Sequence, residues 1–267
     1  MRRAVFCGLA CGVVMSVASA ARAHDTWLLP ARFEVAPGAS IDLELTSGMK
    51  FPEPESVVAP DRIATSGVRL GGRTLTLEPK SPTRAALRLS AAAPTPGVAV
   101  LWVASRPRTL SLTPDDVRHY LEEIGAPPAV EARWRQQRRF RESYSKLAKT
   151  YVKVGEASND TSWRQPVGLG LEFLPLQDPT ALHAGSEFAV RLVRDGKPLG
   201  DFTVSALPPA GGKPVRARTD RDGRAVFMLD RAGPWLLRGT LIEESSAPDT
   251  DWQSLFATLT VSAGQRR

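Results

Sequence analysis

In the stretch Val68-Arg69-Leu70-Gly71-Gly72-Arg73-Thr74-Leu75-Thr76-Leu77, apolar residues alternate with polar ones on both sides of a Gly-Gly pair. Alternation with period two places apolar side chains on one face of a strand. Two adjacent glycines readily adopt the positive φ angles of a two-residue hairpin turn. The stretch therefore predicts a β-hairpin and sets the expectation for the sequence around it.

The same alternation extends outward from this hairpin in both directions. It recurs at Ile41, Leu43 and Leu45, at Leu87 and Leu89, and at Val98, Val100 and Trp102. The turn residues Pro94-Thr95-Pro96-Gly97 separate Leu89 from Val98. Several short strands with regular turn signals are typical of a β-sandwich. We therefore predict an N-terminal β-sandwich domain over residues 24–112.

A second region with the same period runs from about residue 167 to residue 262. Asp195-Gly196 and Asp222-Gly223 supply hairpin turn signals between its strands. Its alternating apolar positions include Phe188, Val190 and Leu192, then Phe202, Val204 and Ala206, then Trp235 and Leu237, and finally Leu255, Ala257, Leu259 and Val261. We predict a C-terminal β-sandwich domain over residues 153–267, and hence a mainly β chain.

Between the two regions the period becomes helical. Val117, Tyr120, Leu121 and Ile124 follow at i, i+3, i+4 and i+7, Thr113 or Asp115 can cap the helix, and Gly125 can end it. A second helix is predicted from about Ala129 to Val152, with an apolar stripe at Phe140, Tyr144, Leu147 and Tyr151. The prediction is a two-helix insert over residues 113–152.

The second predicted helix is rich in arginine, at Arg133, Arg135, Arg138, Arg139 and Arg141. One interpretation is an anion or nucleic-acid site, and the other is a solvated face paired with acids such as Glu131 and Glu142. The formal net charge of the full chain is +7. Without Arg2, Arg3 and Arg22 it falls to +4, with 32 basic and 28 acidic residues. This modest charge favours the solvated face, and we expect no nucleic-acid partner.

The first 23 residues have the pattern of a secretory signal peptide. Arg2 and Arg3 precede a small-residue apolar stretch, and Ala21-Arg22-Ala23 is an A-x-A cleavage site. We expect a periplasmic protein that begins at His24 and keeps no integral membrane segment. Both cysteines, Cys7 and Cys11, would be removed, so disulfides are not expected; a lipid anchor at Cys11 is the alternative.

Catalytic motifs are missing from the 267 residues. There is no glycine-rich phosphate loop, no G-x-S-x-G and no H-E-x-x-H. Adjacent acids such as Glu122-Glu123 and Glu243-Glu244 are better explained as solvated pairs than as a glycosidase pair. We therefore expect a protein that is not an enzyme.

His24 is the best candidate for specific chemistry. As the first residue of a processed chain, it would offer an α-amine and an imidazole that together chelate one metal ion. Nickel, cobalt and copper suit these nitrogen ligands. A third ligand is needed, and the candidates are the adjacent Asp25 and the remaining histidines, His119 and His183. The alternative is an N-terminus that begins with His without any role.

Several motifs together resemble the domain-of-unknown-function 4198 family, whose periplasmic members are sometimes grouped with cobalt and nickel transport accessories. The resemblance spans nearly the whole chain after residue 23 and rests on His24-Asp25-Thr26-Trp27-Leu28-Leu29-Pro30, Tyr120-Leu121-Glu122-Glu123-Ile124-Gly125, Arg141-Glu142-Ser143-Tyr144 followed by Lys146 and Lys149, Leu171-Glu172-Phe173-Leu174-Pro175, Gly233-Pro234-Trp235-Leu236 and Asp251-Trp252-Gln253-Ser254-Leu255. It implies β-sandwich domains and a non-enzymatic role in handling a transition metal. The second β region also resembles transthyretin-like sandwiches. Some relatives carry a His on the strand after the Gly-x-Trp-Leu motif, whereas residues 237–242 here contain none.

The predicted fold is thus mainly β, with two Ig-like or transthyretin-like β-sandwich domains and a two-helix insert. The first functional hypothesis is a periplasmic protein that binds nickel, cobalt or copper through His24 and delivers it to a membrane metal transporter or an outer-membrane receptor. The alternative is an envelope module that binds a protein or polysaccharide and no metal. A copper oxidase built on an N-terminal histidine brace is the third and weakest hypothesis.

Overall fold

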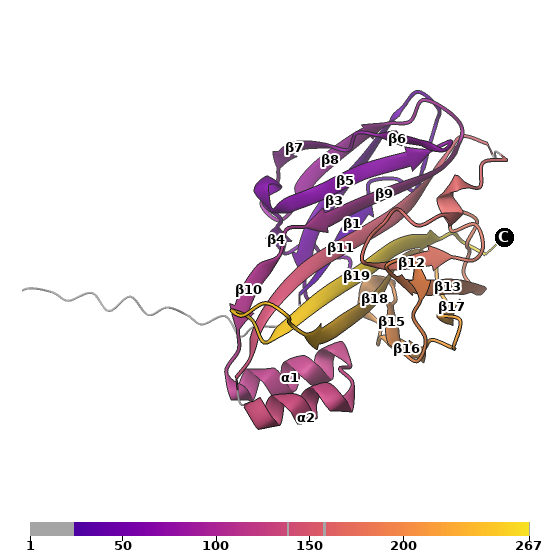
Figure 1. The fold of residues 1–267 in the computed structure, drawn as a ribbon. Coiled ribbons are helices and arrows are strands. Elements are labelled where there is room, and N and C mark those ends of the chain that lie inside the picture. Colours follow the sequence, from indigo (N-terminus) through magenta and orange to yellow (C-terminus); the bar gives the residue numbers. More distant parts are fainter. Residues whose placement is uncertain (1–23, 138, 157–158, 267) are drawn as a thin grey trace, which may run out of the picture.

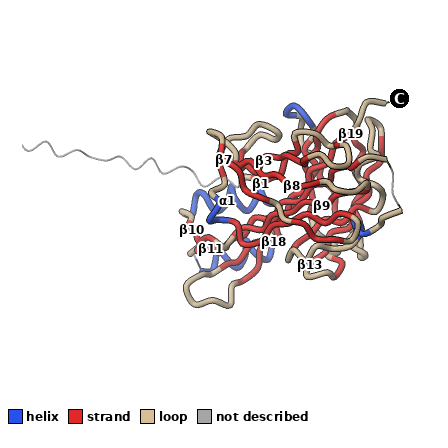
Figure 2. Tube along the Cα trace, turned by 90° about the horizontal axis from the view of Figure 1, so that it is seen from above, coloured by secondary structure: helices blue, strands red, loops and turns tan. Residues whose placement is uncertain are grey.

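The computed structural model describes residues 24–137, 139–156 and 159–266. The predicted signal peptide, residues 1–23, lies outside the described residues, as do both cysteines. The mainly β fold with two helices is confirmed, and strands form the body of the molecule in Figure 2. None of the helices in the described ranges is long and apolar enough to cross a membrane.

The described strands form three sheets (Figure 1). An N-terminal sheet contains β1 (Asp25–Pro30), β3 (Ser40–Gly48), β4 (Ser56–Val57), β7 (Glu78–Pro82) and β8 (Leu87–Ala92). A C-terminal sheet contains β12 (Leu171–Pro175), β13 (Ser186–Arg194), β14 (Lys197–Pro198) and β17 (Arg224–Leu229). A large central sheet contains β2 (Glu34–Val35), β5 (Ile63–Leu70), β6 (Arg73–Leu75), β9 (Gly97–Ser105), β10 (Arg108–Ser111), β11 (Arg141–Val154), β15 (Thr203–Leu207), β16 (Val215–Arg218), β18 (Gly233–Glu244) and β19 (Trp252–Ala263).

The central sheet is shared by both sandwiches. Strand β11 pairs with β9 from the N-terminal half and lies parallel to β19 from the C-terminal half. On one face of β11, Ala148, Val152 and Val154 pack in a core with β1, β3 and β8. On the other face, Leu147 and Tyr151 pack in a core with β12, β13 and β17. The two sandwiches are therefore stacked on opposite faces of one sheet.

The hairpin predicted from the Gly-Gly pair is confirmed. Strands β5 and β6 pair antiparallel around Gly71 and Gly72, whose φ angles are 58° and 72°. Positive φ at both central residues defines the hairpin turn that matches the twist of its strands. The Asp195-Gly196 turn between β13 and β14 also has positive φ at both residues.

The first predicted helix is confirmed as α1 (Pro114–Ile124). The Thr113 hydroxyl accepts a hydrogen bond from the Asp116 N–H, so Thr113 and not Asp115 is the N-cap. Gly125 ends the helix in the left-handed conformation with φ 65°. Tyr120 and Leu121 are buried where α1 packs on the central sheet.

The second predicted helix is wrong over most of its length. Helix α2 (Pro128–Gln137) is short, and residues 141–154 form strand β11 instead of a helix. The expected helical stripe of Phe140, Tyr144, Leu147 and Tyr151 is divided between the core beneath the helices and the core beneath the C-terminal sheet. The structural helical segment therefore ends at residue 137 rather than 152.

Four of the arginines in this region form ion pairs, and the fifth, Arg138, lies outside the described residues. Arg139 and Arg141 both form ion pairs with Asp251. Burial would raise the pKa of Asp251, but the hydrogen bonds from these two arginines lower it to about 2. The other two pairs are Arg135 with Glu131 at 2.6 Å and Arg133 with Glu244 at 3.1 Å. The expected partner Glu142 is elsewhere: its Oε1 accepts a 2.5 Å hydrogen bond from the Tyr120 hydroxyl.

A buried ion pair joins β11 to the C-terminal sheet. Lys149 Nζ lies 2.5 Å from Glu172 Oε1, and their side chains are 1% and 0% exposed. Lys149 also donates to the Phe173 carbonyl, while Glu172 accepts from the Val167 and Gly168 N–H groups. Burial lowers the pKa of Lys149, and the Glu172 carboxylate opposes this shift. Each charge depends on the other for compensation in the core.

Removing only one of these charges should be costly. We expect Lys149→Met to lower the free energy of unfolding by about 3–5 kcal/mol, because it leaves a buried carboxylate without its cation. Lys149→Met/Glu172→Gln should recover part of this loss, since a neutral Gln oxygen still accepts from Val167. Urea unfolding measures both, and Lys153→Met, which removes a half-buried cation on the same strand, is the control with little effect. A double variant less stable than the single one would contradict this account.

A second prediction concerns Glu142, whose pKa is raised by burial. Below the unfolded-state pKa of about 4.3 the carboxyl is protonated in both states. Between that pKa and the raised folded-state pKa, the unfolded chain ionises while the folded state keeps the buried carboxyl protonated, so ionisation favours the unfolded state. The unaltered protein therefore loses stability that the Glu142→Gln variant keeps.

We expect the stability of Glu142→Gln relative to the unaltered protein to increase as the pH rises above about 4.3, and to level off above the raised folded-state pKa of Glu142. Chemical unfolding at several pH values checks the trend, with the exposed Glu53→Gln as the control. A stability difference that does not change with pH would show that burial does not control this carboxyl.

Candidate functional site

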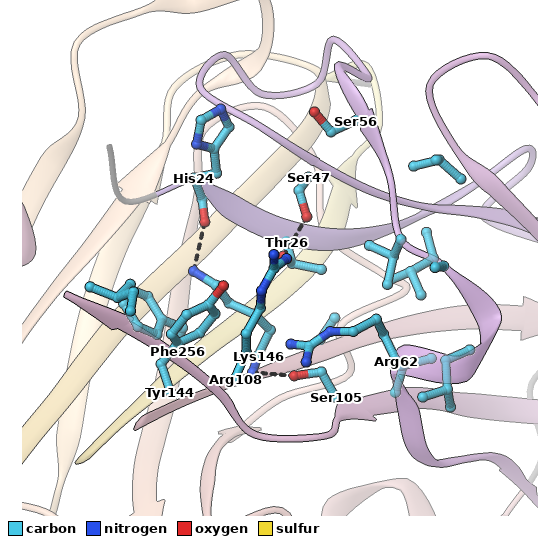
Figure 3. A pocket seen from close by; sticks show the side chains of 18 of the residues that line it. His24, Thr26, Ser47, Ser56, Arg62, Ser105, Arg108, Tyr144, Lys146 and Phe256 are labelled. Atoms are coloured by element: carbon cyan, nitrogen blue, oxygen red, sulfur yellow. Dashed lines mark hydrogen bonds between the residues drawn. The ribbon is translucent and has the colours of Figure 1, made fainter. Parts of the chain in front are cut away.

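A cavity of about 360 Å³ lies between the N-terminal sheet, the central sheet and α1. This volume is within the range of small-molecule binding pockets. The wall includes residues of β1, β3, β4, β10, β11 and β19, and Figure 3 shows the side chains that reach into it.

Lys146 is a central residue of the cavity wall. It lies on the same face of β11 as Ala148, so it points toward the N-terminal half. Its Nζ donates a 2.8 Å hydrogen bond to the His24 carbonyl and lies 3.4 Å from the centre of the Phe256 ring. Burial lowers the pKa of Lys146 to about 8, and the Asp25 and Glu142 carboxylates oppose the shift. The residue is partly exposed because it opens onto the cavity.

Two arginines add to the positive charge of the cavity. Arg62 comes from a 3-10 turn at Pro60–Arg62, and Arg108 opens strand β10, where it is paired in register with Tyr144. Figure 3 shows both guanidinium groups within the space enclosed by the lining residues. The described wall contains no aspartate or glutamate. The cavity is therefore strongly cationic.

The remainder of the wall is largely apolar and aromatic. Phe256 and Tyr144 meet edge to face with ring centres 6.0 Å apart. Hydroxyl groups of Ser47, Ser105 and Thr26 supply a few polar contacts. A small number of polar groups in an apolar wall is typical of sites for small organic ligands. Aliphatic side chains complete the wall, among them Leu45, Val58, Ile63, Val103, Leu110 and Leu112.

His24 lies at the edge of this cavity, just before β1 begins at Asp25. Its side chain is 38% exposed, and its Nε2 is 3.7 Å from Glu55 Oε1. The other oxygen of Glu55 accepts a 2.9 Å hydrogen bond from the Met49 N–H. This bond is the main cause that lowers the pKa of Glu55, and His24 adds to it. A carboxylate is thus held beside the candidate metal ligand.

Asp25 does not join His24. Its side chain is buried and forms a 2.6 Å ion pair with Arg238 Nη1 of β18. Adjacent residues of a strand point to opposite faces, so Asp25 is directed away from the side on which His24 lies. Arg238 thus anchors β1 to β18 through this ion pair.

The other two histidines are not brought to His24. His119 is exposed on α1 and does not line the cavity. His183 is exposed and forms a bridge with Gly264. Gly264 lies eight residues beyond Phe256 along β19, or about 26 Å away at strand spacing. In the described ranges no cluster of three or more His, Cys, Asp or Glu side chains is placed to hold a metal ion.

Sequence reasoning missed the charged residues of this cavity and its edge. Glu55, Arg62 and Arg108 lie in segments without any motif, and Lys146 was noticed only as part of a family pattern. No local signal marks them, because they come from four separate segments that meet only in the folded chain. The placement of Lys146 also depends on the strand that was predicted as a helix.

Comparison with solved structures finds distant similarity to several proteins. The D0-D1 domain of intimin is 13% identical, with 89% of this chain and 97% of that chain covered and a TM-score of 0.24. The Escherichia coli adhesin FdeC is 15% identical, with coverages of 90% and 63% and a TM-score of 0.24. The ligand-binding domain of human OSCAR is 13% identical, with coverages of 89% and 97% and a TM-score of 0.22. These scores are too low to transfer any property of those proteins.

No curated protein matches the sequence. The model of one protein family, described as Domain of unknown function (DUF4198), matches residues 21–242. This match covers most of the chain and agrees with the motifs that begin at His24. The chain therefore belongs to the DUF4198 family.

Proposed function

We propose that this protein is a non-enzymatic binding protein of the periplasm that holds a divalent transition ion, nickel, cobalt or copper, at His24 after its signal peptide has been removed. The observation that carries the proposal is the position of His24 at the edge of a cavity with the Glu55 carboxylate 3.7 Å from its Nε2.

The two nitrogen donors of His24 suit such an ion, although in the described residues no third His, Asp or Glu ligand joins them. Cleavage before His24 creates an α-amine, which forms a six-membered chelate with Nδ1 of the same residue. A carboxylate facing Nε2 favours a proton on that nitrogen and leaves Nδ1 for the metal, as in many metal sites where a carboxylate orients the histidine. Glu55 is itself held by the Met49 N–H, so it is positioned before the ion arrives.

The backbone of the ligand is also fixed. The carbonyl oxygen of His24 accepts from Lys146 Nζ, which anchors the residue to the central sheet. The Lys146 charge lies close to this position and opposes a bare cation by Coulomb repulsion. This repulsion favours an ion whose charge is partly balanced by other ligands. The ion would then be delivered to a membrane transporter or an outer-membrane receptor.

The test is a titration of the processed protein with Cu²⁺ and Ni²⁺, after intact-mass measurement has shown that it begins at His24. We expect binding, which His24→Ala should abolish because it removes the imidazole. The chain still extended by its signal peptide should also fail to bind, because its residue-24 nitrogen is an amide and no α-amine lies next to the imidazole. Glu55→Gln should weaken binding by about ten- to hundredfold, as expected of a residue that orients a ligand.

His119→Ala and His183→Ala are the matched controls, since neither side chain lies near His24. Both should bind as the unaltered protein does. Equal binding by the unaltered protein, His24→Ala and the extended chain would eliminate the chelate and leave the interaction-module hypothesis. A first residue other than His24, or a lipid mass on Cys11, would also contradict the proposal.

A further inference from the structure

The cavity has no carboxylate in its described wall to balance its cations, although the nearby Asp25 and Glu142 carboxylates attract Lys146. Lys146, Arg62 and Arg108 line it, and no carboxylate does so in the described ranges. The hydrogen-bond acceptors of these cations are backbone carbonyls: that of His24 for Lys146 Nζ and that of Pro107 for Arg62 Nη1. None of the three forms an ion pair in the described part of the chain.

Arg108 differs from Arg62 and Arg106 because its guanidinium donates no hydrogen bond to a backbone carbonyl in the described residues. Arg106, two residues earlier, donates to the Asp61 carbonyl and lies outside the cavity. Arg108 is the first residue of β10 and directs its guanidinium into the space in front of Thr26, as Figure 3 shows. A guanidinium presents several N–H donors in a planar fork that suits a carboxylate or a similar oxyanion.

The wall beyond these cations is apolar. Phe256, Tyr144, Leu110 and Ile63 line it, and the volume of about 360 Å³ accommodates a small organic molecule. Inorganic anions would fill the charged part and leave the apolar surface in contact with water. An anion with a hydrocarbon portion would satisfy both parts of the wall.

We infer that this cavity is a binding site for a small organic anion, with a carboxylate or similar oxyanion placed among Arg108, Arg62 and Lys146 and its hydrocarbon part against Phe256 and the aliphatic wall. The inference goes beyond the metal function and does not depend on it. The same cations repel a metal ion and attract an anion, so the ligand and the His24 site are chemically distinct.

The experiment is isothermal titration calorimetry of the purified protein with octanoate and with 4-phenylbutyrate. Each is compared with its neutral amide, which has nearly the same shape and no charge. All titrations contain a metal chelator, so that loss of the His24 chelate cannot change the result. We expect at least one acid to bind with a dissociation constant below about 1 mM, and its amide to bind at least about tenfold more weakly.

Arg108→Gln should weaken binding of the acid by about tenfold, with less effect on the amide. This residue is exposed, so the substitution is not expected to unfold the protein. Lys146→Met should weaken binding of the acid to a similar extent. An unchanged circular dichroism spectrum shows that this variant is folded. Arg221→Gln is the matched control, because it removes the same charge from a turn with a side chain that is 93% exposed.

Three results would overturn the inference. The first is that the amides bind as tightly as the acids, which would show that the cavity recognises only the apolar part of the ligand. The second is that Arg221→Gln weakens binding as much as Arg108→Gln, which would show a general effect of net charge. The third is that neither acid binds with a dissociation constant below about 1 mM, which would mean that the cationic wall does not recognise organic anions.

Discussion

The fold depends on one strand that must be buried on both of its faces. Strand β11 lies between β9 and β19, and all of its residues from Leu147 to Val152 are buried. One face supports the N-terminal sheet and the other supports the C-terminal sheet. The buried Lys149–Glu172 pair is tolerated on this strand because each charge compensates the other and the backbone satisfies their remaining hydrogen bonds.

The same strand positions the candidate site. Lys146 lies three residues before Lys149, and the period of two turns it to the opposite face. There Lys146 meets a cavity between the N-terminal and central sheets and the carbonyl of His24, instead of a packed core. Strand β11 thus supplies Lys149, paired with Glu172, to the core of the C-terminal sandwich. It supplies Lys146, which forms no ion pair in the described residues, to the edge of the N-terminal sandwich.

The error over residues 141–152 has a physical origin. Phe140, Tyr144, Leu147 and Tyr151 are spaced by four, three and four residues, which is the period of an amphipathic helix. A strand buried on both faces does not show alternation, because both sets of side chains are apolar or paired. The pairs formed with β19 and β9 come from residues more than 100 and about 50 positions away. The local pattern therefore indicates a helix where long-range pairing makes a strand.

The sequence by itself determined the features that depend on neighbouring residues. The Gly71-Gly72 turn, the Thr113 cap, the Gly125 helix end and the alternating strands all follow from local backbone preferences. The family motifs and the prominence of His24 were also visible in it. Only the tertiary structure decided that the sandwiches share a sheet, that Asp25 pairs with Arg238, and that Glu55 faces His24. These contacts join segments far apart in the chain, and their geometry arises only when the core of the sheets is packed.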